Sequence, residues 1–236
     1  MMFCRIADLT VAVPEVGDLV SRCQAYLCDG ESGADIVIHP DRFRLDAWKG
    51  LTGDALIYME SGIRFQANLL QHGGIILHAS AVALDGRAYL FSAPCGTGKS
   101  THTRLWQSVF GTDAKVFNDD KPALRLLEGK WYAYGTPWCG KDGININMKV
   151  PVAGICFLKQ AQENKIHRLS QQEALQRIIW QTVHKFKTLE RLDLMLSMVE
   201  SLVREIPIFE LENKPEPEAV QLSYKTMCCA AEEMGL

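Results

Sequence analysis

The residues best suited to chemistry in this sequence stand close together in residues 91–101, which read FSAPCGTGKST. Successive backbone N–H groups in a glycine loop, followed by the N-terminus of a helix, form a concave site for an anion. Gly96 and Gly98 carry no Cβ, so the backbone can approach phosphate groups closely. Lys99 would then reach the β- and γ-phosphates of a nucleotide, and the hydroxyl of Ser100 would bind Mg²⁺. The sequence therefore predicts a site for ATP and Mg²⁺, with these phosphate-binding residues: Cys95, Gly96, Thr97, Gly98, Lys99, Ser100 and Thr101.

The Gly-Lys-Ser triplet alone is weak evidence, because glycine is about 7% of ordinary sequences and such a triplet arises often by chance. A strand before the loop, a helix after it and Gly96 two places before Gly98 are separate conditions, and together they make a chance match rare. Ala93 stands where the pattern G-x-x-x-x-G-K-[ST] has its first glycine. The sequence thus departs from the general phosphate-loop pattern at this position and favours one particular group of relatives.

Two adjacent carboxylates, Asp119 and Asp120, follow a short apolar strand that contains Val116 and Phe117. In open α/β sheets, ligands bind at the carboxyl ends of strands. Adjacent carboxylates repel each other, so one is expected to bind Mg²⁺ while the other, with a shifted pKa, accepts the proton of an attacking hydroxyl. We assign Asp120 to the metal and Asp119 to the base, although the sequence does not fix their order. The alternative is a solvated turn before Lys121.

Two further residues are candidates for roles in catalysis. His78 lies in an apolar strand, where a histidine is either a core residue or, near a carboxylate base, a group that tunes that base. Lys141, in the stretch WCGK, is expected to make a second contact to phosphate outside the loop. The alternative for Lys141 is an ordinary solvated lysine.

The elements around these residues follow from local patterns. Residues 75–94 alternate apolar and β-branched side chains on both sides of Asp85-Gly86, which predicts a hairpin leading into the phosphate loop. A helix with an apolar face follows the loop and ends at Gly111. Ser170 and Glu173 form a capping box that opens a helix. The other expected elements are strands at 3–13, 34–39, 115–120 and 152–158, a hairpin around 128–129, and helices at 60–71, 170–187, 189–204 and 217–233.

These elements predict an α/β protein with a mixed β-sheet flanked by helices and a β-rich N-terminal lobe. We expect residues 1–73 to form this lobe and residues 74–236 to form the domain that contains the phosphate loop.

Three motifs resemble HPr kinase/phosphorylase and the wider group of HPr-kinase-like proteins: LHASAVALDGRAYLFSAPCGTGKST, then KVFNDD, then GTPWCGK. The resemblance covers residues 75–158 and implies the P-loop fold that this group shares with phosphoenolpyruvate carboxykinase. It implies roles for His78, for residues 95–101 and for the pair Asp119 and Asp120. Thr101 departs from the glutamate typical of the family, and the family's Glu-Ile-Arg-Gly stretch is absent, so phosphorylase activity is not implied. The chain resembles a small stand-alone member of the group.

These features predict an ATP-dependent kinase that transfers the γ-phosphate to a hydroxyl, with a serine of a peptide or protein as the expected acceptor. Asp119, His78, Lys99 and Lys141 are the expected catalytic residues, and Ser100 and Asp120 are the expected ligands of Mg²⁺. Two alternatives remain at this stage. One is a kinase for a small polyol or amino acid, and the other is a regulatory module that binds nucleotide without transferring phosphate.

Composition restricts the classes of partner. The formal net charge is −3, with 25 basic and 28 acidic residues interspersed along the chain, and no basic stripe marks a nucleic-acid interface. The N-terminus lacks the pattern of a signal peptide, and no apolar run approaches the length of a membrane span. We therefore expect a cytoplasmic protein that binds neither nucleic acid nor membrane, with its eight cysteines reduced. A homo-oligomer remains open.

Overall fold

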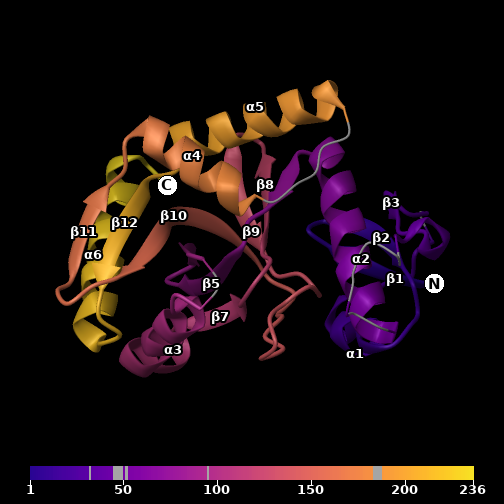
Figure 1. Cartoon of the computed structure of the whole chain (residues 1–236), viewed down its shortest axis with the longest axis horizontal. Coiled ribbons are helices and arrows are strands. Elements are labelled where there is room, and N and C mark those ends of the chain that lie inside the picture. Colours follow the sequence, from indigo (N-terminus) through magenta and orange to yellow (C-terminus); the bar gives the residue numbers. More distant parts are fainter. Residues whose placement is uncertain (32, 45–49, 51–52, 95, 183–187) are drawn as a thin grey trace.

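The computed structural model describes the whole chain except residues 32, 45–49, 51–52, 95 and 183–187 (Figure 1). Within the described residues it contains a three-stranded sheet near the N-terminus and a nine-stranded mixed sheet whose strands lie between residues 74 and 213. The α/β class expected from the sequence is therefore confirmed. Each cysteine within the described residues has a free thiol.

The N-terminal lobe begins with a hairpin. Strands β1 (Met2–Ile6) and β2 (Leu9–Val13) are antiparallel, and the turn between them holds Ala7 and Asp8 at positive φ. The short strand β3 (Ile36–Val37) pairs in parallel with β2. The lobe also contains helix α1 (Asp18–Cys23) and the 17-residue helix α2 (Gly53–Leu69). It is thus a mixed lobe rather than a β-rich one, because α1 lay outside the expected elements and α2 begins before residue 60.

The large sheet has the strand order β4-β8-β9-β10-β6-β5-β7, and β12 extends it through β10 while β11 pairs with β12. Asp85 and Gly86, both at positive φ, make the tight turn between β5 and β6, as their sequence predicts. Glu128 and Gly129 do the same between β8 and β9. The strands are β4 (Gly74–Ile76), β5 (Ala79–Leu84), β6 (Arg87–Ser92), β7 (Lys115–Asn118), β8 (Ala123–Leu127), β9 (Lys130–Tyr134), β10 (Lys149–Gln160), β11 (Lys165–Arg168) and β12 (Ile208–Asn213).

Strand β10 connects two parts of the large sheet. Its first residues pair antiparallel with β9, whereas its later residues pair in parallel with β6 on one side and with β12 on the other. Since β5 lies antiparallel between β6 and β7, the strands β6, β7, β10 and β12 all run in the same direction. Their carboxyl ends therefore meet at one edge of the sheet.

Helices cover both faces of this sheet (Figure 1). Helices α3 (Lys99–Phe110) and α6 (Pro217–Glu233) pack on one face, where Tyr89, Phe91 and Trp106 belong to one buried apolar cluster. Helices α4 (Gln171–Gln181) and α5 (Leu189–Glu205) lie on the other face, over a second cluster. The two clusters arise because successive strand residues point to opposite faces of the sheet.

A third apolar cluster joins the N-terminal lobe to the large sheet. Phe65 of α2 stacks on Trp138, with ring centroids 4.6 Å apart, and both side chains are buried. The Arg125 guanidinium on β8 donates to the backbone carbonyls of Ala7 and His72, so the lobe is also held by buried hydrogen bonds.

The capping box is present as predicted: Glu173 N–H donates to Ser170 Oγ, and the Glu173 side chain accepts from Ser170 N–H. Helix α4 ends at Gln181, and the expected continuation to residue 187 falls mostly on residues 183–187, outside the described part of the chain. Of the helices that the structure describes, none combines the length and apolar character needed to cross a bilayer.

Candidate functional site

The predicted phosphate loop lies between β6 and α3. Gly98 is the N-cap of α3 in a left-handed conformation with φ 108°, and Gly96 has φ 79°. A Cβ at either glycine would meet open space, so glycine is favoured here by backbone conformation and not by crowding. His102 N–H donates to Gly98 O at 2.9 Å, which starts the helical ladder directly after the loop. The loop therefore presents the N-terminus of a 12-residue helix toward the sheet edge.

Lys99 folds back along the loop and is buried. Its Nζ donates to the backbone oxygen of Ala93 at 2.9 Å, and its charge acts on the Asp120 carboxyl. Ala93 itself packs in the apolar cluster beneath α3. The apolar core therefore accommodates a methyl group at the position where the usual pattern has its first glycine.

The other predicted residues of the loop are less buried than Lys99. Gly96 and Thr101 are exposed, and Thr97, Gly98 and Ser100 are half-buried. The backbone oxygen of Ser100 accepts from Thr103 Oγ1 in the first turn of α3. Cys95 lies outside the described residues.

The carboxylate pair lies at the same sheet edge as the loop. Strands β6 and β7 flank β5, both run antiparallel to it, and both therefore end at this edge. Asn118, the last residue of β7, is fully buried and shapes the turn that follows. Its Oδ1 accepts from the backbone N–H groups of Asp120 at 3.0 Å and Lys121 at 2.7 Å. Asn118 was not predicted from the sequence, although asparagine before two aspartates is a typical residue for such a turn.

Asp119 is 5% exposed, and its Oδ1 accepts from the backbone N–H of Gly140 at 2.6 Å. Burial raises the pKa of the Asp119 carboxyl, the Gly140 hydrogen bond opposes this, and the charge of Asp120 adds to the increase. A Cβ at Gly140 would lie 2.8 Å from Asp119 Oδ2, so only glycine allows this approach. Gly140 is a second site residue that was not predicted, and the glycine-rich character of its loop was the available signal.

Asp120 contacts His78, with Oδ1 3.2 Å from Nε2, and Lys121, with Oδ2 3.6 Å from Nζ. Burial alone would raise the pKa of the Asp120 carboxyl, but the His78 hydrogen bond and the charges of Lys121 and Lys99 outweigh it and lower the pKa. His78 Nδ1 lies 2.9 Å from Gln181 Oε1 at the end of α4, which fixes the plane of the imidazole ring. The structure thus brings His78 and Asp120 together within reach of the Lys99 charge, while the side chain of Asp119 contacts the Gly140 turn.

Lys141 is exposed and follows Gly140 in a turn closed by the hydrogen bond from Gly143 N–H to Gly140 O. Its backbone is therefore near Asp119, while its side chain lies in solvent. The neighbouring Asp142 forms an ion pair with Arg104 of α3, which ties this turn to the helix that follows the phosphate loop.

No group of three or more His, Cys, Asp and Glu side chains suited to a metal occurs within the described residues. Mg²⁺ in nucleotide sites is typically held by one or two protein ligands together with phosphate oxygens and water. The Asp120 carboxylate with its lowered pKa and the half-buried Ser100 hydroxyl are hard oxygen donors of that type. The residues present therefore fit Mg²⁺ bound together with a nucleotide.

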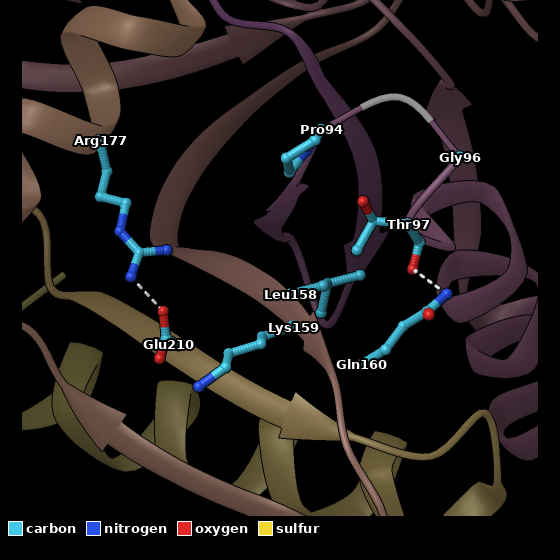
Figure 2. Close-up of a pocket in the computed structure, with 8 residues that line it drawn as sticks. All are labelled: Pro94, Gly96, Thr97, Leu158, Lys159, Gln160, Arg177 and Glu210. Atoms are coloured by element: carbon cyan, nitrogen blue, oxygen red, sulfur yellow. Dashed lines mark hydrogen bonds and ion pairs between the residues drawn. The ribbon is translucent and has the colours of Figure 1, made fainter.

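A cavity of about 440 Å³ adjoins the phosphate loop on the side away from the carboxylate pair. It lies at the carboxyl end of β10, below α4 and beside β12 (Figure 2). Arg177 of α4 forms an ion pair with Glu210 of β12 at one side, and Gln160 Nε2 donates to Thr97 O at 3.4 Å at the other. The remaining lining residues are Pro94, Gly96, Leu158 and Lys159.

The sequence matches the model of one protein family. A sequence model of the family described as "SynChlorMet cassette protein ScmC" matches residues 55–215. These residues contain the phosphate loop, the carboxylate pair, the Gly140 turn and the lining of the cavity. This family is not an HPr kinase family, so the predicted resemblance is not a family assignment.

No curated protein matches the sequence. Among solved structures, one similar chain is "Structure of the Hpr(Ser) kinase/phosphatase from Coxiella burnetii", with 11% identity and a TM-score of 0.39. The match covers 68% of this chain and 92% of that chain. A similarity at this TM-score adds nothing to the functional argument, which depends on the geometry of the site.

Proposed function

The chain belongs to the ScmC family of SynChlorMet cassette proteins, and we propose that it binds ATP with Mg²⁺ and transfers the γ-phosphate to a hydroxyl group. The observation that carries this proposal is the shared sheet edge. The loop that caps α3 with Gly98 and the carboxylates that follow β7 lie at the same edge, and the charge of Lys99 reaches Asp120. This is the arrangement that transfer of a phosphoryl group requires, because such catalysis is mostly positioning and charge neutralisation.

The phosphate loop has the first role in this mechanism. The N–H groups at the start of α3 and the Lys99 ammonium would neutralise the phosphate oxygens. Ser100 and Asp120 would hold Mg²⁺, which supplies charge neutralisation at the β- and γ-phosphates. His78 donates to Asp120 and keeps that carboxyl ionised.

Asp119 has the second role. Its raised pKa and its fixed Oδ1 leave Oδ2 to accept a proton from the acceptor hydroxyl as the oxygen bonds to phosphorus and ADP leaves. Lys141, in the turn next to Asp119, would contact the transferred phosphate from the solvent side. We propose a serine of a peptide or protein as the acceptor, on the basis of the motif resemblance to HPr-kinase-like proteins.

The substitution Asp119→Asn tests the proposal. It should leave ATP affinity near the wild-type value, while transfer of labelled γ-phosphate to an acceptor from a peptide and metabolite panel slows by about 10²- to 10⁴-fold. Glu163→Gln, which removes an exposed carboxylate in an ion pair with Lys165, is the control and should keep normal transfer. Full transfer activity in both Asp119→Asn and Asp120→Asn would overturn the kinase mechanism.

A further inference from the structure

The cavity beside the phosphate loop contains a buried acid that the proposed mechanism does not use. Glu210 is 7% exposed and lies in the middle of β12, opposite Phe157 of β10 in the strand register. A buried carboxylate is costly because it loses hydration, even when it is paired. Arg177, its partner, is nearly half exposed and belongs to a different element, α4. A charged group held at the wall of a cavity in this way is positioned to contact a ligand.

The position of the cavity restricts what that ligand is. Across the carboxyl ends of the strands, Asp119 and Asp120 follow β7 on one side of the phosphate loop, while Leu158 and Gln160 end β10 on the other. A triphosphate whose γ-phosphate is next to the carboxylates has its α-phosphate at the far end of the loop. The group attached to that α-phosphate then extends toward β10 and β12.

We propose that this cavity binds the nucleoside part of the triphosphate, with Glu210 accepting hydrogen bonds from the ribose 2′- and 3′-hydroxyls. This inference rests on the proposed ATP site. The Arg177 contact uses Glu210 Oε2, and a carboxylate has acceptor capacity on both oxygens, so Oε1 remains able to accept from the ribose. The guanidinium of Arg177 is planar and lies over the ring of Phe157 at 5.7 Å, and such a plane also stacks on a base.

The size and lining of the cavity agree with this occupant. Its volume of about 440 Å³ falls within the range of small-molecule sites, which starts near 300 Å³. Pro94 and Leu158 provide apolar surface, and Gln160, Lys159, Thr97 and the ion pair provide polar groups. The contact between Gln160 and Thr97 O joins the cavity wall to the phosphate loop itself, so a ligand can occupy both.

The test compares ATP with inorganic tripolyphosphate, each titrated with Mg²⁺ into the full chain by calorimetry. Glu210→Gln should weaken ATP by about tenfold or more, the usual effect of losing hydrogen bonds to a charged group, and should leave tripolyphosphate unchanged. Lys99→Ala should weaken both ligands. Glu232→Gln, which removes an exposed acid of α6 that pairs with Arg87 of β6, is the matched control and should change the affinity for neither ligand.

A second ligand separates ribose recognition from a structural role of the ion pair. Wild-type protein should prefer ATP over 2′,3′-dideoxy-ATP by about tenfold, and Glu210→Gln should lose most of that preference. Gln160→Trp, which fills the cavity from an exposed position, should weaken ATP and spare tripolyphosphate. Unchanged ATP affinity in Glu210→Gln would overturn the inference, and so would an equal decrease in the affinities for ATP and tripolyphosphate. In either case, the Lys99→Ala titrations still test the phosphate loop by themselves. A wild-type chain that binds neither ligand would instead overturn the proposed function.

Discussion

At the scale of single residues, the site depends on how one backbone N–H reaches Asp119. Gly140 approaches this carboxylate so closely that a methyl group would come within 2.8 Å of Oδ2. The hydrogen bond from Gly140 N–H fixes Oδ1 of Asp119. Asn118 fixes the turn that follows β7, because its Oδ1 accepts hydrogen bonds from the backbone N–H groups of Asp120 and Lys121. The positions of the two aspartates therefore depend on Gly140 and Asn118, to which the proposed mechanism gives no direct part in the reaction.

We predict that Gly140→Ala lowers the rate of phosphate transfer by at least about tenfold, because Asp119 must shift to admit the new Cβ. ATP affinity should change little, since the phosphate loop is untouched. Gly143→Ala is the control in the same turn: its Cβ meets open space, although the backbone has φ 72°. Steady-state kinetics for both variants separate displacement of Asp119 from strain in the turn. Normal kcat in Gly140→Ala would contradict the role given to this contact.

His102 gives a prediction about stability rather than activity. It is 1% exposed in α3, accepts from Trp106 Nε1 at 3.2 Å, and burial lowers its pKa to about 4. In the unfolded chain a histidine has a pKa near 6.5, so below that pH the unfolded state binds the proton first. The stability contributed by neutral His102 is therefore present above about pH 6.5 and is lost as the pH falls toward 4.

Urea unfolding at pH 7 and pH 5 tests this prediction. The wild-type free energy of unfolding should fall by about 2 kcal/mol more than that of His102→Gln over this range, because only the wild type has the shifted imidazole. An equal decrease in the two proteins would mean that His102 does not titrate with a lowered pKa.

At the scale of elements, the N-terminal lobe holds the loop that carries Gly140. Tyr58 of α2 donates to Cys139 O at 2.8 Å and accepts from Cys139 N–H at 2.6 Å. Arg22 of α1 donates to Cys139 Sγ and lies over the Tyr58 ring, 4.7 Å from its centroid. The residue next to Gly140 is thus fixed by two helices from the other lobe. In the mechanism that we propose, the lobe therefore positions this loop.

We predict that Tyr58→Phe lowers kcat while the KM for ATP stays near the wild-type value. Removing the hydroxyl leaves the N–H and C=O of buried Cys139 without this partner, at a cost of about 1 to 3 kcal/mol in unfolding free energy. Tyr132→Phe is the matched control and should leave kcat unchanged. Tyr132 is a half-buried tyrosine of β9, and the Lys149 ammonium lies 4.6 Å from the centroid of its ring. Loss of stability without a change in kcat would show that the lobe does not position the loop.

At the scale of the whole molecule, the local patterns predicted the hairpins and the long helices best. Asp85-Gly86 and Glu128-Gly129 adopt positive φ because of short-range turn chemistry, and the helix from Pro217 ends at Glu233 as expected. Strand β12 was not predicted, since its place is fixed by pairing with β10, about 50 residues earlier in the chain. Long-range pairing of this kind has no local signal.

The candidate site likewise combines residues with a local sequence signal and residues whose position depends on long-range contacts. The residue types in the phosphate loop and the pair Asp119 and Asp120 were visible in the sequence because they are consecutive. Gly140 and Glu210 were not, because their importance comes from contacts with Asp119 and Arg177 that only the folded chain creates.

The most direct test of the central claim is calorimetric titration of ATP with Mg²⁺ into the wild-type chain and into Lys99→Ala. We expect one ATP site per chain in the wild type and a decrease in ATP affinity of at least about 100-fold in the variant, because a buried cation next to the phosphates is lost. The thermal unfolding temperature of both proteins, measured without nucleotide, controls for damage to the fold. Equal ATP affinity in the two folded proteins would contradict the account.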